Sequence, residues 1–357
     1  DGTISFDFMK TTEEGGGSST EESLMLSRSG WSAKADGYAS SGYDLLYFNS
    51  TRGGKKVKNS RITGQRNNDI FFSRTNVQGE WEDPALLEDE GINTEFDEGS
   101  CGLSEDGQSL YFTVSKQVKG ETLGTAIYVS QRSGGAWSEP KEVELLQDST
   151  ISVAQPALSP DGKYLYFVSD MDGGYGGKDI WRCEKLGQEW GAPENLGDVI
   201  NTPSEEMFPS FRADGRLYFS SDGHGGFGGL DICEAVLLPK QNEKDADTWQ
   251  VTVMPDPINS SSDDFGITFA GKENKGFFSS NRGNKKFYDH IFSFYQPELE
   301  FVMSGKIEDT GGEALGDARI KLVGSDGTIA TIQPKKNGTY SFNLNKGTRY
   351  VMMAACR

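Results

Sequence analysis

The hydrophobic pattern of this chain comes from one short motif that recurs five times. In its clearest copy an apolar triplet, Leu165-Tyr166-Phe167, follows an Asp-Gly turn and precedes a glycine-rich loop, an Asp-Ile pair and a tryptophan. The triplets are Leu46-Tyr47-Phe48, Leu110-Tyr111-Phe112, Leu165-Tyr166-Phe167, Leu217-Tyr218-Phe219 and the weaker Gly276-Phe277-Phe278, with first residues 64, 55, 52 and 59 apart. Several markers kept in one order at this period indicate the blades of a β-propeller.

The residues of each triplet predict a strand that is buried on both faces. Tyr164 to Val168 are apolar or aromatic without alternation, as a strand requires when both of its faces are covered. Asp161-Gly162, just before them, is a hairpin signal because glycine accepts a positive φ. No convincing amphipathic helix occurs in the repeats. Blades stacked around an axis would cover both faces, so we predict an all-β fold with a propeller.

The N-terminal region is less regular than the repeats. Residues 44–296 contain all five repeats, and the last, from Asp264 to Phe294, has no following tryptophan. Residues 1–43 have strand-like patterns at 4–8 and 23–28, which we interpret as a partial blade that closes the ring. Closure removes exposed sheet edges. We therefore predict a propeller over residues 1–296, with six blades preferred and five as the alternative.

The pattern changes after residue 296. Over 299–357 Lys and Arg outnumber Asp and Glu by eight to six, whereas the whole chain carries a net charge of −19. Short alternating strands such as 301–307 and 318–322 are separated by glycine turns. This pattern predicts a small β-sandwich over residues 297–357. Because the sequence stops directly after an apolar run, we expect the sandwich to be truncated.

Composition excludes several classes of partner. A net charge of −19 argues against nucleic acid, which is bound by clustered Lys and Arg, and against an anionic membrane surface. No run of 18 apolar residues exists, so no transmembrane helix and no membrane insertion are expected. The start at Asp1 favours a mature or excised fragment. Of the four cysteines, Cys183 and Cys233 lie near Asp-Ile pairs; free buried thiols are preferred, with a disulfide as the alternative.

The repeats resemble the PD40 family, the WD40-like or TolB-type propellers. The residues that carry the resemblance are Ser159-Pro160-Asp161-Gly162-Lys163, residues 165–170 and Asp179-Ile180-Trp181. The loops 173–177 and 225–229 are similar to those of multidomain OmpA-like envelope proteins of Bacteroidetes, and the C-terminal part resembles the carboxypeptidase regulatory-like domain that follows the propeller in them. A close relative of this arrangement is a periplasmic component of type IX secretion.

The resemblance implies a location and a role. It implies a periplasmic protein, associated with the outer membrane, that holds other envelope proteins, such as secretion or outer-membrane components. It also implies contact with peptidoglycan only through an OmpA-like domain outside this chain. A non-catalytic interaction scaffold is the function that we expect, and no cofactor is implied.

Candidate catalytic residues are few. His224 lies in a glycine loop and His290 in a strand, and neither is close to a nucleophile motif. Ser262-x-Asp264-x-Gly266-x-Thr268-Phe269 matches the Asp box of sialidase propellers, which is itself a turn-stabilising device. A glycan- or peptide-acting hydrolase is therefore the alternative to a scaffold. Asp172 and Asp222 lack calcium-loop spacing, so no metal is expected.

The glycine loops provide the candidate partner-binding surface. In a four-stranded blade they share one face of the ring with the segments between blades. The residues that this places together are Tyr175, Phe227, Asn201, Glu205 and Glu206. Two exposed aromatic side chains surrounded by acids would suit a protein segment or a basic partner. The alternative is that both rings pack against the neighbouring blade. Asp179 and Asp231 are expected to accept main-chain N–H groups at strand starts.

Overall fold

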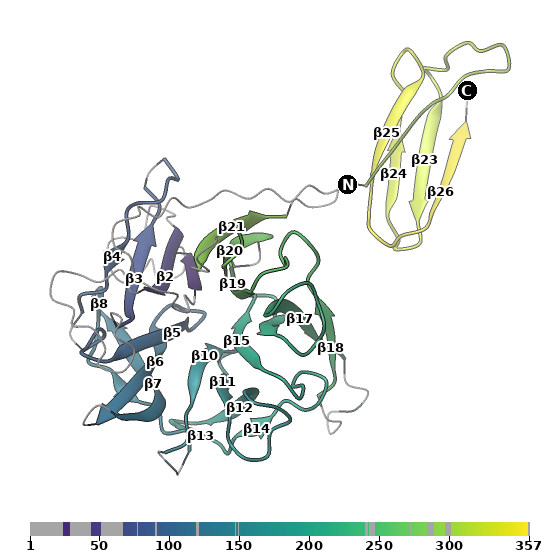
Figure 1. Cartoon of the computed structure of the whole chain (residues 1–357). Coiled ribbons are helices and arrows are strands. Elements are labelled where there is room, and N and C mark those ends of the chain that lie inside the picture. Colours follow the sequence, from purple (N-terminus) through teal and green to yellow (C-terminus); the bar gives the residue numbers. More distant parts are fainter. Residues whose placement is uncertain are drawn as a thin grey trace. The chain divides into compact units, whose positions relative to one another are not determined.

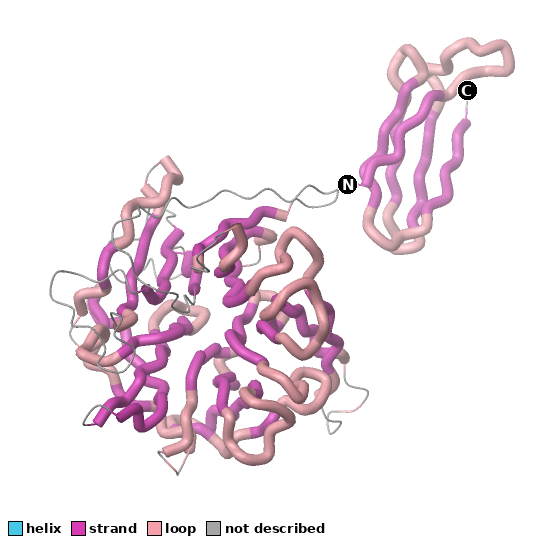
Figure 2. Tube along the Cα trace, viewed as in Figure 1, coloured by secondary structure: helices cyan, strands magenta, loops and turns pink. Residues whose placement is uncertain are grey.

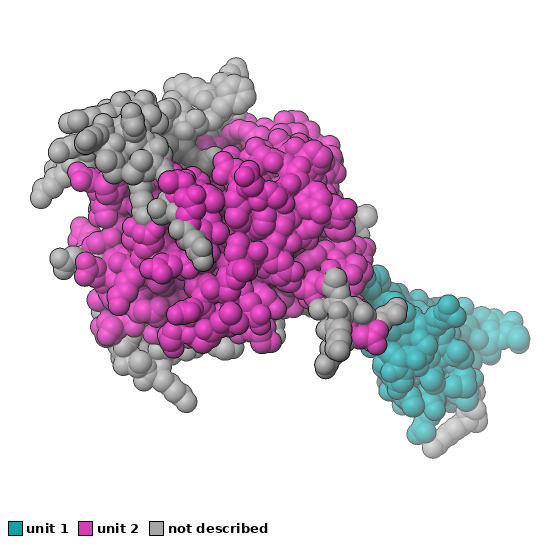
Figure 3. All heavy atoms as spheres, turned by 90° about the horizontal axis from the view of Figure 1, so that it is seen from below, with its two compact units in different colours: residues 1–3, 297–357 teal, residues 4–296 magenta. Residues whose placement is uncertain are grey.

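The computed structural model contains two compact units. It describes residues 24–28, 44–50, 67–118 without 77 and 90, 121–239 without 147 and 149, 242, 247–283 without 272, 289–296 and 301–355. For residues 24–28, 44, 116–118 and 121–123 only the main chain is described. The described residues up to 296 belong to one unit, and those from 301 onward belong to the other (Figure 3). Among the described residues, no helix is long and apolar enough to cross a membrane.

Among the described residues, five antiparallel sheets form the blades of the larger unit, and they surround one axis (Figure 1). Blade 1 contains β1 (Leu24–Arg28), β2 (Asp44–Ser50), β3 (Asp69–Arg74) and β4 (Ala85–Leu86). Blade 2 contains β5 (Asp97–Leu103), β6 (Ser109–Val118), β7 (Glu121–Ser133), β8 (Ala136–Trp137) and β9 (Lys141–Glu142). Blade 3 contains β10 (Ala154–Leu158), β11 (Tyr164–Ser169), β12 (Asp179–Leu186), β13 (Glu189–Trp190) and β14 (Glu194–Asn195). Blade 4 contains β15 (Glu206–Phe211), β16 (Leu217–Ser221), β17 (Asp231–Leu237) and β18 (Trp249–Val253), and blade 5 contains β19 (Asp264–Phe269), β20 (Lys275–Ser280) and β21 (His290–Tyr295).

The apolar triplets form the interfaces between blades, as their two-sided pattern predicts. Leu165 and Phe167 of blade 3 pack with blade 2 residues, whereas Tyr166 between them packs with blade 4 residues. In blade 4, Leu217 and Phe219 face blade 3, and Tyr218 faces blade 5. Blades 1 and 2 follow the same rule. Successive side chains of a strand point to opposite faces, so a three-residue apolar run joins each blade to both neighbours.

The ring closes through five blades, and the preference for six was wrong. Phe277 and Ile291 of blade 5 pack directly on Leu46 and Phe48 of blade 1, which leaves no place for a further blade between them. The predicted strand at 23–28 exists as β1, but it pairs with β2 as the first strand of blade 1. It takes the position that β5, β10, β15 and β19 take in the other blades. The strand-like pattern at 4–8 lies outside the described residues.

The described part of the smaller unit, residues 301–355, is a β-sandwich of five strands. They are β22 (Phe301–Lys306), β23 (Arg319–Gly324), β24 (Ile329–Ile332), β25 (Thr339–Leu344) and β26 (Tyr350–Ala355), and Figure 2 shows them with their connecting loops. One sheet pairs β22 with β25, and the other has the order β24-β23-β26. Ile320, Leu322 and Phe342 form its buried centre. The described edge strand β26 keeps Val351, Met352 and Met353 exposed, and the predicted truncation stays an expectation.

Candidate interaction surface

The connections of each blade alternate between the two ends of its sheet because successive strands are antiparallel. The Asp-Gly turns between first and second strands lie at one end. The loops between second and third strands lie at the other end, together with the segments that lead into the next blade. We call this end of blades 3 and 4 the glycine-loop face. Its residues are 170–178, 196–205, 222–230 and 254–263.

Buried aspartates hold the two glycine loops. The Asp179 carboxylate accepts the main-chain N–H groups of Tyr175 and Gly176 at 2.6 and 3.1 Å. Asp231 accepts those of Phe227 and Gly228 at 2.8 and 3.0 Å. Both carboxylates are almost fully buried. The prediction that these aspartates accept main-chain hydrogen bonds is confirmed, and each one fixes the loop that carries an aromatic residue.

The glycines allow these loops to lie directly on the next blade. A Cβ atom on Gly176 would overlap the carbonyl oxygens of Thr202 and Ser204. A Cβ atom on Gly228 would overlap the carbonyl oxygen of Ser262. The Gly177 N–H donates to the Ser204 carbonyl at 2.9 Å. These glycines are therefore required for close approach of two backbones.

The two loop aromatics are the most prominent apolar groups of the face. Tyr175 is 51% exposed and Phe227 is 52% exposed. They occupy equivalent positions, four residues before Asp179 and Asp231 respectively. Their main chains are fixed while about half of each ring faces solvent. Packing against the neighbouring blade, the alternative considered above, does not cover them.

Asn201 is a structural residue, and its assignment to the binding surface was wrong. Its side chain is 1% exposed. Its Oδ1 accepts the Ile180 N–H at 2.8 Å, and its Nδ2 donates to the Ile180 carbonyl at 3.0 Å. Asn93 and Asn259 hold Ile70 and Ile232 in the same way. A polar residue that recurs at the same place in three repeats was the signal for this structural role.

The two adjacent glutamates have different environments. Glu205 is half-buried and forms an ion pair with Lys178 at 3.0 Å, so it remains part of the face. Glu206 is fully buried, and its carboxylate accepts hydrogen bonds from the N–H and hydroxyl of Thr202 and from the Ser221 hydroxyl. A partner cannot reach it. Its predicted role in binding was therefore wrong.

Blade 2 contains the equivalent acid without its full set of donors. Glu98 is fully buried and accepts the Thr94 hydroxyl at 2.5 Å, but its Oε2 has no hydrogen-bond partner. Val114 stands where Ser221 stands in blade 4. Burial, with the Asp69 and Asp97 carboxylates nearby, raises the pKa of Glu98 to about 8. Burial also raises the pKa of Asp69 to about 6.

The residues considered for catalysis make structural contacts. A ring nitrogen of His224 lies 2.8 Å from the Ile200 carbonyl. In the Asp-box segment Asp264 is fully buried, accepts the Ser260 N–H and hydroxyl, and forms an ion pair with Arg282. His290 opens β21, opposite Ser280. Among the residues whose side chains are described, no group of three His, Cys, Asp or Glu is placed to hold a metal ion.

The described cysteines lie in blade interfaces. Cys183 packs between blades 2 and 3, and Cys233 between blades 3 and 4. Both are free and buried, as is Cys101. Burial raises the pKa of the Cys183 thiol to about 11 and that of Cys233 to about 12. These thiols are packing groups.

Comparison with known proteins finds likenesses only among solved structures, and all of those reported have low identity and low TM-scores. No family model matches the sequence, and no curated protein matches it. Solved structures that it resembles include TolB from Acinetobacter baumannii (15% identity, TM-score 0.31), with 64% of this chain covering 60% of that one. A protein of unknown function from Dyadobacter fermentans DSM 18053 has 12% identity and a TM-score of 0.41, with coverage of 76% and 93%. An alpha-L-arabinofuranosidase from Lactobacillus brevis has 14% identity and a TM-score of 0.44, with coverage of 75% and 88%. At these TM-scores no activity or partner transfers to this chain.

Proposed function

We propose that this protein is a non-catalytic scaffold whose glycine-loop face holds a protein partner. The observation that carries the proposal is the pair of half-exposed rings, Tyr175 and Phe227, on loops that are fixed by Asp179 and Asp231. A ring held on a rigid loop loses little conformational freedom when it is covered. Large aromatic side chains are also the residues that most often anchor protein interfaces.

The charge of the face favours a basic partner. Its four segments contain seven acidic residues and one lysine, and five of the acids are exposed. The acids are Asp170, Asp172, Asp198, Glu205, Asp222, Asp256 and Asp263. Lys or Arg side chains of a partner would gain attraction from these acids and could stack on the two rings.

The cellular setting is part of the same proposal. The PD40-like repeats, followed by a sandwich that resembles a carboxypeptidase regulatory-like domain, favour a periplasmic protein of an outer-membrane assembly. The partners would be envelope proteins, with protein secretion of type IX as the process. Attachment to peptidoglycan would occur through an OmpA-like domain beyond these residues.

Photo-crosslinking in the native envelope tests the proposal. A benzophenone amino acid replaces Tyr175 or Phe227, and a control replaces Lys163 in the Asp-Gly turn at the opposite end of blade 3. The expected result is discrete protein adducts from the two loop positions and none from position 163. Equal adducts from all three positions, or none from the loops, would contradict the assignment of this face.

A further inference from the structure

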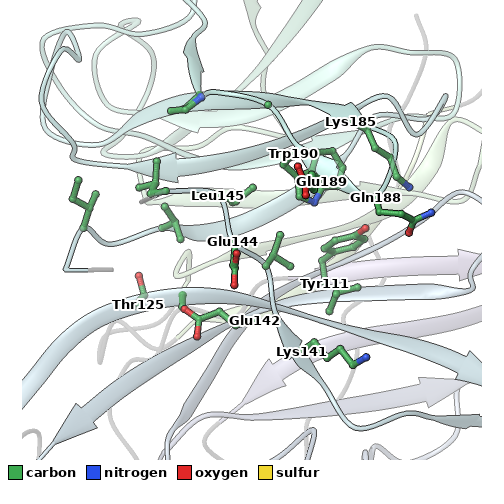
Figure 4. Close-up of a pocket in the computed structure, with 18 of the residues that line it drawn as sticks. Tyr111, Thr125, Lys141, Glu142, Glu144, Leu145, Lys185, Gln188, Glu189 and Trp190 are labelled. Carbon is green, nitrogen blue, oxygen red and sulfur yellow. The ribbon is translucent and has the colours of Figure 1, made fainter. Parts of the chain in front are cut away.

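A groove opens between blades 2 and 3, and none of its lining residues belongs to the glycine-loop face. It has a volume of about 1610 Å³. One wall is blade 2, with Val129 and Gln131 of β7, residues 138–139 and 141–146, and lining residues of the segment 148–153 that leads into blade 3. The other wall is the β12–β13 hairpin of blade 3, with Lys185 and residues 188–193. Figure 4 shows residues of both walls around the same space.

Comparison with the next interface explains why the groove is open. Between blades 3 and 4, Arg182 pairs with Asp247 at 2.7 Å, and its guanidinium lies 3.5 Å from the Tyr166 hydroxyl. The register places Arg182 opposite Tyr166, and it places Val129 opposite Tyr111.

Asp247, the partner of Arg182 in this ion pair, is also replaced at the interface between blades 2 and 3. Asp247 lies two residues before Trp249, and Gln188 lies two residues before the equivalent Trp190. Val129 and Gln188 therefore replace the ion pair that bridges the next two blades. Both residues line the groove.

The lining combines apolar surface with an excess of acids. Val129, Leu145, Leu146, Trp190 and Pro193 contribute apolar side chains. The charged lining residues are five acids and two lysines, namely Glu139, Glu142, Glu144, Asp148, Glu189, Lys141 and Lys185. One lysine, Lys185, already lies over the Trp190 ring, with its Nζ 5.9 Å from the ring centre. The groove therefore favours a ligand that has both apolar and cationic groups.

The groove borders main chain as well as side chains. Lys141 to Leu146 line it without a gap, although successive side chains of an extended segment point to opposite sides. Among the described strands, β9 within this segment pairs with β7 alone. An extended ligand that lies along this segment would therefore contact its main chain as well as its side chains.

We propose that the groove between blades 2 and 3 binds an extended segment of a partner protein in which apolar residues alternate with Lys or Arg. The apolar side chains lie on Val129, Leu145 and Trp190, and the cations face Glu144 and Glu189. The segment runs beside Lys141–Leu146. This site is separate from the glycine-loop face, so either can fail without the other.

Binding of a defined peptide tests this site. The probe is a dye-labelled seven-residue peptide that alternates Lys with Val and carries one benzophenone group. A second peptide has Glu in place of Lys. Fluorescence anisotropy with the whole protein at about 50 mM salt, where charge attraction is weakly screened, gives the Kd. Mass spectrometry of the photo-adducts gives the position.

Three variants locate the interaction. Glu144→Lys and Glu189→Lys should each weaken Lys peptide binding about tenfold, and Glu184→Lys, on the same hairpin but outside the lining, should leave it within twofold. Val129→Arg with Gln188→Asp introduces the Arg–Asp ion pair that joins blades 3 and 4 and leaves the net charge unchanged. This pair would close the groove, so the double variant should not bind the peptide. A thermal unfolding curve confirms that this double variant is folded.

The expected result is binding of the Lys peptide, none of the Glu peptide, and adducts within residues 141–146 or 188–193. The proposal is overturned by absence of Lys peptide binding, by equal binding of both peptides, or by binding that is unchanged in the double variant. Adducts confined to residues 170–178 or 222–230 would overturn it in favour of the glycine-loop face.

Discussion

The Asn201 side chain completes the main-chain hydrogen bonding of Ile180, because its amide accepts the Ile180 N–H and donates to the Ile180 carbonyl. Ile180 is the second residue of β12, and both residues are buried. The segment between blades is thereby fixed to the strand that follows the glycine loop. Asp179, whose carboxylate fixes the loop that carries Tyr175, begins the same strand.

We expect Asn201→Ala to destabilise the propeller by about 2–4 kcal/mol, because it leaves a buried N–H and a buried carbonyl without partners. Thermal unfolding followed by circular dichroism measures the change as a fall in Tm. Gln250→Ala on the exposed side of β18 is the control and should stay within about 0.5 kcal/mol of the parent protein. Equal Tm values for both variants would contradict the structural role of Asn201.

Gly176→Ala should displace the loop that carries Tyr175, since its Cβ would overlap two carbonyl oxygens of the next blade. Faster amide exchange at Tyr175 and Gly177, and weaker crosslinking from position 175, are the expected results. Gly187→Ala is a suitable control because its φ of +69° costs about 1–2 kcal/mol but its Cβ meets open space. If the two variants loosen the 170–178 loop equally, close approach is not the reason for glycine at 176.

The buried Glu98 should make the protein less stable as pH rises. Its pKa in the folded state is about 8, against an ordinary value of 4.5, so the folded protein binds the extra proton between these values. The contribution of Glu98 to the free energy of unfolding is therefore largest below about pH 4.5, falls as pH rises toward 8, and stays constant above pH 8. Glu98→Gln cannot lose a proton and should raise Tm at pH 8–9 by several degrees while changing little at pH 4.5.

A second substitution separates the charge of Glu98 from its packing. Val114→Ser supplies the hydroxyl that Ser221 donates to Glu206 in blade 4. It should lower the pKa of Glu98 and reduce the slope of Tm between pH 5 and 8, whatever it does to Tm itself. An unchanged slope in both variants would show that another group causes the pH dependence.

The half-buried Arg282 and the fully buried Asp264 form an ion pair in blade 5, and single substitutions of either residue should destabilise the protein strongly. The Arg282 guanidinium also donates to the carbonyls of Pro257 and Ile258. Arg282→Met leaves the Asp264 carboxylate buried without its cation and should cost about 3–5 kcal/mol. Adding Asp264→Asn should recover part of that loss in urea unfolding. Additive losses would mean that the two residues do not interact.

The sequence pattern predicted the strands and their two-sided burial because both depend on local residue order. Leu165, Tyr166 and Phe167 alternate between two blade interfaces in the way that their apolar run requires. The number of blades depends instead on where the last blade meets the first. That contact joins Phe277 to Leu46, which are far apart in the sequence, and no local pattern specifies it.

The binding surface was only partly predictable for a similar reason. Tyr175 and Phe227 were placed correctly on exposed loops, but a sequence does not distinguish a polar side chain in water from one bonded to a buried main chain. Asn201 and Glu206 belong to the second kind. The groove was missed because it follows from Val129 standing opposite Tyr111, and strand register becomes visible only when the blades are paired.

Blades 1 to 4 each present Leu and Phe to the blade before them, blade 5 presents Phe278, and every blade presents an aromatic ring to the blade after it. A gene segment that encodes one repeat therefore encodes both packing surfaces of a blade, one for the preceding blade and one for the following blade. Duplication or loss of such a segment during evolution would preserve the packing between blades and change only the number of blades in the ring. Propellers of different size can descend from one another by this route without new core residues.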